Sequence, residues 1–332
     1  MPSLPPVTAI DNNYARTAST HDDGGSMPGR AHALFPYFVL ALSQMCFASN
    51  HILGRMVEGV VPPIGLSFWR WVGGALILLP FTWRGLIVAW PVIRARWKTL
   101  VVLAITLVPL GNTTIYIGLN FTTAINASVI AVAQPVVTFV LSWVIYRDTI
   151  TRGQAGGAVI AVLGVLTVIS RGDAFSLAQL ELNVGDLFIC VSVVGFALYA
   201  ILLRSAPKEL SPLTMLSILQ IMGAITLAPF YLWESIYVAP VQLNWQTVGA
   251  IIWVAVVIAI LAIWLWNLGV SAIGANKASV YVYLRMFFVA VAAMLILDER
   301  LYLYHFVAFA LVFAGIWMVS RARRQPSERP NN

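Results

Sequence analysis

The feature that most constrains this chain is a series of ten long apolar runs separated by short connections. A membrane-spanning helix needs about 20 mostly apolar residues. Runs of about that length lie at 34–53, 65–83, 100–119, 125–146, 153–171, 185–203, 212–232, 247–268, 276–296 and 303–321. Only 10% of the residues are charged, against roughly 25% in soluble domains. Since the runs are too long for barrel strands, the sequence predicts an all-α membrane protein with ten transmembrane helices.

The distribution of lysine and arginine predicts which way the helices run. With a cytoplasmic N-terminus, fifteen of the 20 basic residues fall in cytoplasmic segments and three, Arg55, Arg171 and Arg300, fall outside. Cytoplasmic loops of membrane proteins carry this excess of positive charge. We therefore expect both termini to be cytoplasmic and the protein to lie in the cell (inner) membrane. The net charge of +7 is explained by these loops, and it does not indicate nucleic-acid binding.

The two halves of the chain repeat one another. At a shift of 149 residues the matches include Ser43 with Ser192, Phe47 with Phe196 and Pro63 with Pro212, and at a shift of 151 they include Ala127-Ser128 with Ala278-Ser279 and Gly164 with Gly315. Each repeat holds five helices, an odd number, so the second repeat must enter the membrane from the opposite side. Such inverted repeats are typical of transporters that bind substrate between the repeats.

The repeats predict a simple domain organisation. A polar N-tail at residues 1–33 has no apolar signal segment and is expected to be disordered. The first five-helix repeat covers 34–171 and the second covers 185–322, followed by a C-tail at 323–332. We expect a monomer or a homodimer whose partners are the lipid bilayer and a small-molecule substrate.

The fourth and fifth helices of the repeats carry a resemblance to a known family. In each repeat small residues open the fourth helix, an acid ends it and a glycine lies in the fifth: Ala127-Ser128, Asp148 and Gly164, then Ala278-Ser279, Glu299 and Gly315. The chain resembles the ten-helix EamA-type transporters of the drug/metabolite transporter superfamily. Pro135 fits that family's mid-helix proline, whereas the second repeat has Arg285-Met286 there. The missing backbone hydrogen bond of Pro135 can bend its helix. Within the family the chain looks most like the YddG-type aromatic amino-acid exporters.

Arg285 is the strongest candidate for substrate binding. It lies about nine residues into its run, roughly 13 Å from the helix start, and a central arginine costs at least ~2.5 kcal/mol to insert. A guanidinium in this place suits a carboxylate or phosphate; the structural alternative is a cation held by groups of the bundle. The repeat maps Gln134 onto Arg285 and Asn126 onto Lys277, so two polar stripes are expected to face each other.

Further candidates come from repeat-related pairs of polar and aromatic residues within the runs. The first and sixth helices offer Phe47 and Asn50 against Phe196 and Tyr199, the third and eighth offer Asn112 and Tyr116 against Asn267 with Trp266 nearby, and the ninth offers Tyr281 one turn before Arg285. Aromatic residues at helical spacing also serve packing, and asparagines also join helices by hydrogen bonds.

The remaining polar groups were interpreted structurally. Arg70, between two tryptophans, is expected to extend to the membrane interface, and His51 is expected to be interfacial as well. Gly157, Ala161 and Gly164 predict close packing of a helix pair. The sequence has no carboxylate in the middle of a run, which argues against proton coupling through a membrane glutamate.

These patterns predict a transporter rather than an enzyme. The sequence contains no nucleotide-binding glycine loop and no HExxH or GxSxG motif, and no cofactor is indicated. We expect alternating-access export of small amphipathic metabolites, above all aromatic or hydrophobic amino acids. The alternatives are exchange of phosphorylated or nucleotide-linked metabolites, drug efflux, and a non-transporting membrane scaffold.

Overall fold

The computed structural model describes residues 30–147, 151–173, 183–273 and 279–322, and within them it contains helices and no strands. The α-helices are α2 (Arg30–Met56), α3 (Pro63–Ala95), α4 (Trp97–Ile105), α5 (Thr114–Leu119), α6 (Ala124–Val132), α7 (Gln134–Tyr146), α8 (Arg152–Ile169), α10 (Val184–Leu202), α11 (Pro212–Tyr237), α12 (Trp245–Trp253), α13 (Ala262–Ile273), α15 (Leu284–Ile296) and α16 (Leu303–Ala322). Two π-helical segments, η1 (Thr106–Thr113) and η3 (Val254–Leu261), join α4 to α5 and α12 to α13, and two short 3₁₀ segments are η2 (Leu203–Ser205) and η4 (Ser279–Tyr283).

The described part of each predicted apolar run falls on helix almost throughout. Six helical segments are long and apolar enough to cross a membrane, and the bent pair α6 and α7 makes a seventh. Shorter apolar helices lie at 281–296 and 303–319. The expectation of an all-helical membrane protein is thus confirmed for the described residues, while the number of ten spans stays a prediction.

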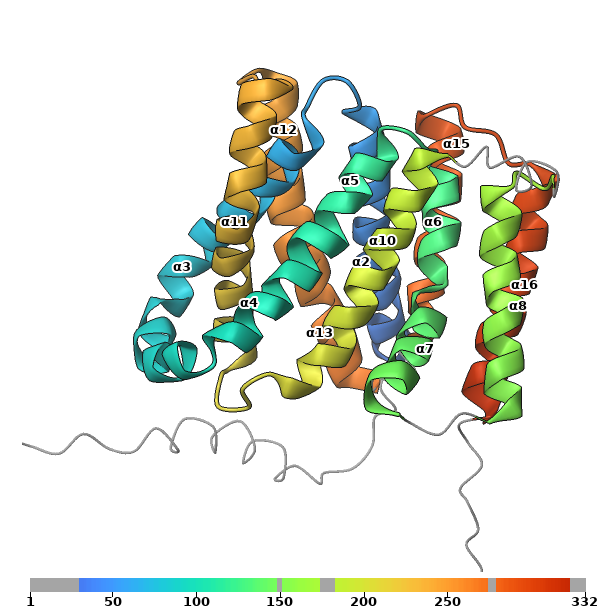
Figure 1. The fold of residues 1–332 in the computed structure, drawn as a ribbon, viewed down its shortest axis with the longest axis horizontal. Helices are drawn as coiled ribbons and strands as arrows, with labels where there is room; N and C mark the ends of the chain where they lie inside the picture. The colour runs from blue at the N-terminus through green and yellow to red at the C-terminus, as the bar shows by residue number, and fades with distance from the viewer. Residues whose placement is uncertain (1–29, 148–150, 174–182, 274–278, 323–332) are drawn as a thin grey trace, which may run out of the picture.

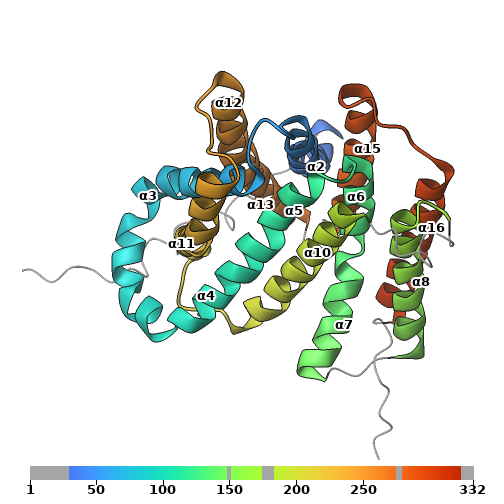
Figure 2. The same ribbon diagram turned by 45° about the horizontal axis from the view of Figure 1, so that its top comes forward.

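The helices run alternately up and down in a bundle (Figure 1). α2 rises from the lower edge, whereas α10 descends from the upper edge, so these two helices have opposite directions. α3 packs against α11 on one flank, and α8 packs against α16 on the other (Figure 2). In the centre α2 packs against α13 and α15, and α10 packs against η1, α5 and α7.

The α8–α16 pair depends on small residues. A Cβ atom on Gly315 would lie 2.4 Å from the carbonyl oxygen of Gly157 and 2.8 Å from the Cβ of Ala161. One on Gly164 would lie 2.9 Å from the backbone oxygen of Ala308. Only glycine permits this approach, so the predicted close packing of Gly157, Ala161 and Gly164 is confirmed.

Two helices break where polar side chains face the interior. α6 and α7 meet at an angle of 42°, because Pro135 has no backbone N–H to continue the ladder. The bend expected at this proline is therefore confirmed. At the repeat-related place in the second half, the 3₁₀ turn of η4 passes into α15 one residue before Arg285, without a proline.

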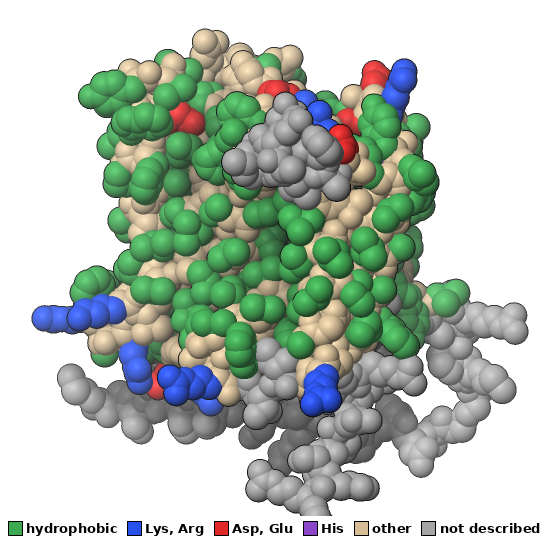
Figure 3. Space-filling view, turned by 45° about the vertical axis from the view of Figure 1, so that its right-hand side comes forward, with side chains coloured by type: hydrophobic (Ala, Val, Ile, Leu, Met, Phe, Trp, Pro, Cys, Tyr) green, Lys and Arg blue, Asp and Glu red, His purple; other side chains and the backbone are tan. Residues whose placement is uncertain are grey.

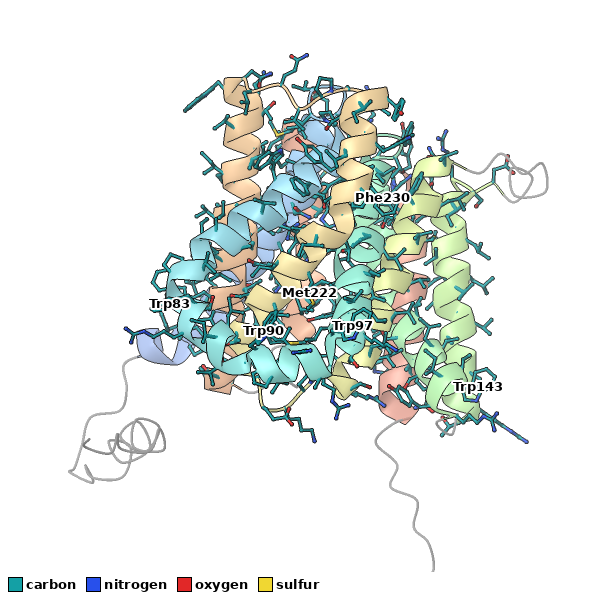
Figure 4. All side chains as sticks on the ribbon, turned by 60° about the vertical axis from the view of Figure 1, so that its left-hand side comes forward. Trp83, Trp90, Trp97, Trp143, Met222 and Phe230 are labelled. Atoms are coloured by element: carbon teal, nitrogen blue, oxygen red, sulfur yellow. The ribbon has the colours of Figure 1, made fainter. Side chains whose placement is uncertain are left out.

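The outer surface is that of a membrane protein. A broad apolar band covers the side of the bundle (Figure 3). Most of the lysines and arginines in view lie at its lower edge, and most of the acidic residues lie near the upper edge beside a few basic ones. Exposed tryptophans follow the lower edge in Figure 4: Trp83, Trp90, Trp97 and Trp143. Tryptophan is enriched at membrane–water interfaces, so these rings fit the boundary of the apolar band.

Candidate functional site

Two adjoining cavities occupy the centre of the bundle. The larger, of about 300 Å³, lies among α2, α3, α10, α11 and the π-helical segments. The smaller, of about 160 Å³, extends toward the α6–α7 bend and the start of α15. Both are lined by the same four residues at their junction: His51, Ile115, Phe196 and Arg285. We call the two together the central cavity.

Arg285 is held at this junction by uncharged groups. Its Nε and Nη2 both donate to Oε1 of Gln44 on α2, at 3.2 and 3.0 Å. Its guanidinium carbon lies 4.6 Å from the ring centre of Phe47, one turn further along α2. A cation over an aromatic face is attracted by the ring, and this fixes the side chain without neutralising its charge.

Arg70 lies in the same cavity, and the expectation that it reaches the membrane interface is wrong. The side chain is only 6% exposed. Its Nη1 donates to Oδ1 of Asn112 at 2.6 Å, to the hydroxyl of Tyr116 at 2.9 Å and to Oδ1 of Asn50 at 3.4 Å. The Tyr116 hydroxyl in turn donates to Asn50 at 2.6 Å. Arg70 stays inside the bundle because acceptors from three helical segments surround its guanidinium and accept its hydrogen bonds there.

Most of the sequence-predicted site residues meet at the central cavity. The larger part is lined by Phe47, Asn50, Asn112, Phe196, Tyr199 and Arg285, and the smaller part by Gln134, Phe196 and Arg285. Tyr116 is buried behind the lining and bonded to Arg70. Three further candidates also line neither part: Tyr281 stacks on Tyr37 with ring centres 6.1 Å apart, Trp266 is partly buried on α13, and Asn267 is exposed. Lys277 and Asp148 lie outside the described residues.

Sequence reasoning missed several polar residues at the cavity. Gln44 is fully buried and supports Arg285. Gln220 lines the larger part, and neither its amide nitrogen nor its amide oxygen has a hydrogen-bond partner among the described residues. His51 is 5% exposed and lines both parts, so its predicted interfacial position is wrong. Gln44 could have been found from its sequence position, because it lies three residues before Phe47 and six before Asn50 and so shares their face of the helix.

Two hydrogen-bonded carboxylates, Glu234 and Glu299, lie elsewhere, at the upper end of the bundle. Glu234 accepts backbone N–H groups of Ile64 and Gly65 at 3.0 and 2.6 Å. Glu299 accepts those of Ala124 and Ile125 at 2.8 and 3.0 Å. Each therefore caps the start of a helix, α3 or α6, where a negative charge is stabilised by the helix dipole. No Asp or Glu lines either part of the central cavity in the described chain.

At the same end of the bundle, a series of hydrogen bonds between side chains joins the two halves of the protein. The Thr122 hydroxyl donates to Oδ1 of Asp186 at 2.5 Å, and Asn126 links Thr122 to His305 at 3.5 and 2.9 Å. The backbone N–H of Tyr302 donates to Nδ1 of His305, so Nε2 carries the proton that Asn126 accepts. Asn126, expected to face the interior stripe, belongs to this chain.

An all-helical apolar bundle around a polar, arginine-containing cavity defines a membrane transporter as the class of protein. The EamA-like transporter family model matches residues 34–170 and 183–321. The chain belongs to that family.

Relatives agree with this assignment, and a solved structure shares the fold. The uncharacterized transporter YyaM of Bacillus subtilis (strain 168) is 29% identical over 280 residues, 82% of this chain and 90% of the relative. An uncharacterized transporter of Archaeoglobus fulgidus is 25% identical over 291 residues, 87% of this chain and 98% of the relative. A crystal structure with 17% identity matches at a TM-score of 0.54 and covers 88% of this chain and 98% of its own, which concerns the fold alone.

Proposed function

We propose that the chain is a ten-span transporter built from two inverted five-helix repeats, 34–171 and 185–322. A mirrored pair of hydrogen bonds supports this: Ser43 on α2 donates to the carbonyl of Ala262 at 2.8 Å, and Ser192 on α10 donates to that of Gly111 at 2.5 Å. The repeat relates Ser43 to Ser192 and Gly111 to Ala262, so the donors and the acceptors of the two bonds correspond. The π-helical segments η1 and η3 occupy related places as well. Rocking of one repeat against the other would give alternating access to the cavity.

The orientation that we propose has both termini in the cytoplasm and the protein in the cell (inner) membrane. Its support is the positive charge along the lower edge in Figure 3, where α2 begins and α16 ends. We propose that the protein is a monomer or a homodimer in this orientation. In a variant without Cys46 and Cys190, a single cysteine placed in 174–182 should label from outside intact cells. Labelling only after lysis would overturn the orientation.

The proposed cargo is a small amphipathic carboxylate, in the first place an aromatic or hydrophobic amino acid, as in the YddG-type exporters. The observation that carries this proposal is Arg285 at the cavity junction, whose hydrogen bonds to described residues go to a neutral glutamine and which is flanked by Phe47. The guanidinium would bind the carboxylate, and Phe47, Phe196 and Tyr199 would contact the side chain. A cationic drug would meet two arginines and no lining carboxylate, which disfavours drug efflux.

The test is transport by purified protein in liposomes, comparing phenylalanine with its uncharged amide. Losing a charge-assisted contact costs about 1.5–3 kcal/mol, so Arg285→Gln should reduce phenylalanine transport roughly tenfold or more and abolish the preference for the acid. Arg285→Lys should restore it partly, because an ammonium cannot form the bidentate contact. Equal impairment for acid and amide would make Arg285 a structural cation.

A second candidate function is exchange of phosphorylated or nucleotide-linked metabolites. The observation that favours it is the second buried arginine, Arg70, in the same cavity. Liposomes preloaded with a sugar phosphate should then take up labelled phosphate ester by exchange. Uptake of amino acids alone would reject this candidate.

A further inference from the structure

Among the described residues, the central cavity is lined by two guanidinium groups and by no Asp or Glu. Arg285 donates to Gln44, and Arg70 donates to Asn50, Asn112 and Tyr116, all of them neutral. The carboxylates Glu234 and Glu299 are engaged with helix starts. A charge removed from water costs several kcal/mol unless it is paired. Two uncompensated cations facing one cavity therefore favour an occupant with two negative charges.

The two arginines are spaced along a single stripe of α2. Arg285 contacts Gln44 and Phe47, and Arg70 contacts Asn50, three residues further on. Three to six residues of helix correspond to a rise of about 5–9 Å. The ends of a small dicarboxylate are separated by a comparable length. Phe47 lies beside the path between the two cations, where an apolar body would lie.

Arg70 also keeps donors for a ligand. All three of its hydrogen bonds use the single nitrogen Nη1. Its Nε, which is buried, has no hydrogen-bond partner among the described residues. The network thus positions the guanidinium in the wall of the cavity without neutralising its charge, so this charge remains for an anionic ligand.

We propose that Arg70 forms a second anion subsite and that the preferred cargo is a small dianion, with one anionic group at Arg285 and the other at Arg70 around a short apolar body. This inference rests on the proposed function, transport of carboxylates through the central cavity. Within the carboxylates of the proposed function it ranks a diacid above an aromatic amino acid, which would pair with Arg285 and leave Arg70 without a counter-charge.

The experiment uses the full-length protein in liposomes and three labelled probes: phenylsuccinate, its monoamide and phenylalanine. Wild type should transport phenylsuccinate roughly tenfold or more faster than the monoamide at low concentration. Arg70→Gln should remove that preference while transport of the monoamide remains, whereas Arg285→Gln should impair all three probes. The matched control is Arg55→Gln. Arg55 lies outside the cavity and bonds to the carbonyl of Leu119 and to Glu58, so the preference should persist.

Asn112→Asp gives an independent test that keeps the arginine. It places a carboxylate at the atom that lies 2.6 Å from Nη1 of Arg70, with almost no change in shape, and should also abolish the preference for the diacid. Equal rates for diacid and monoamide in wild type, with phenylalanine still transported, would overturn the dianion inference and leave the proposed function standing. An Arg70→Gln protein that slows all three probes equally would overturn it too. Failure of wild type to move any of the three would overturn the proposed function itself.

Discussion

The centre of the bundle and its upper end differ in how their charged side chains are stabilised. At the upper end each of Glu234 and Glu299 accepts two backbone N–H groups from the start of a helix. In the centre the described hydrogen bonds of Arg70 and Arg285 go to neutral side chains. Both regions are apolar in composition, so the difference lies in the partners that the fold provides.

This difference separates structural charges from functional ones. A carboxylate that caps a helix completes the hydrogen bonding of that helix, and its charge is stabilised within the folded chain. A buried guanidinium without a counter-ion contributes little to folding, since its desolvation is not offset. In the function that we propose, the ligand supplies the missing charge.

The largest effect is expected from giving the central arginine a counter-ion. Gln44→Glu changes the neutral oxygen that lies 3.0 Å from Arg285 Nη2 into a carboxylate of the same shape. The new ion pair should occupy the guanidinium, reduce carboxylate transport more than tenfold and raise the melting temperature. Transport in liposomes and thermal unfolding in detergent measure the two effects.

Gln44→Met is the matched control for that substitution. It removes the same hydrogen bond without adding charge, so transport should fall by a smaller factor and the preference for an acid over its amide should remain. If Gln44→Glu transported carboxylates as wild type does, the centre would not be an anion site, and the contrast between the two regions would disappear.

The next effect in size concerns the upper end. Glu299→Gln leaves an amide with one accepting oxygen for the two N–H groups of Ala124 and Ile125. Loss of this charge-assisted capping should cost about 1.5–3 kcal/mol of stability, seen as a lower melting temperature. The protein that remains folded should keep its preference for acid over amide. A changed preference would place Glu299 in the transport mechanism.

The smallest effects are expected between the two regions, at the mirrored serines. Ser43→Ala and Ser192→Ala each remove one buried hydrogen bond to a helix carbonyl, worth about 0.5–1.5 kcal/mol. Because the bonds are related by the repeat, the two variants should lower the melting temperature by similar amounts. Strongly unequal losses would argue against equivalent roles of the two repeats.

Local sequence patterns predicted the helices and one of the two cavity arginines, Arg285. The length of the apolar runs was sufficient to predict the helices, and Pro135 was sufficient to predict the bend. The position of Arg285 in the middle of a run was sufficient to place it in the interior. Arg70 was misassigned because its neighbours in sequence, Trp69 and Trp71, suggested an interface. Its actual partners Asn112 and Tyr116 are about 40 residues away and come close only through packing of α3 on α5 and η1.

The sequence also could not distinguish which candidate side chains face inward. Tyr281 and Asn267 have the same helical spacing as the lining residues, but the 3₁₀ turn of η4 directs Tyr281 onto Tyr37 and α13 leaves Asn267 exposed. A local change in helix type rotates every following residue. That change depends on packing between the repeats and has no proline or glycine signal in the second half.

The central claim is that the cavity arginines serve the ligand and the upper carboxylates serve the fold. The most direct test is the melting temperature of Arg285→Gln in detergent, measured beside that of Glu299→Gln and wild type without substrate. The account predicts that Arg285→Gln melts at or above the wild-type temperature even though it has lost carboxylate transport, while Glu299→Gln melts several degrees lower. A melting temperature of Arg285→Gln that falls as far as that of Glu299→Gln would contradict the account and make Arg285 a structural residue.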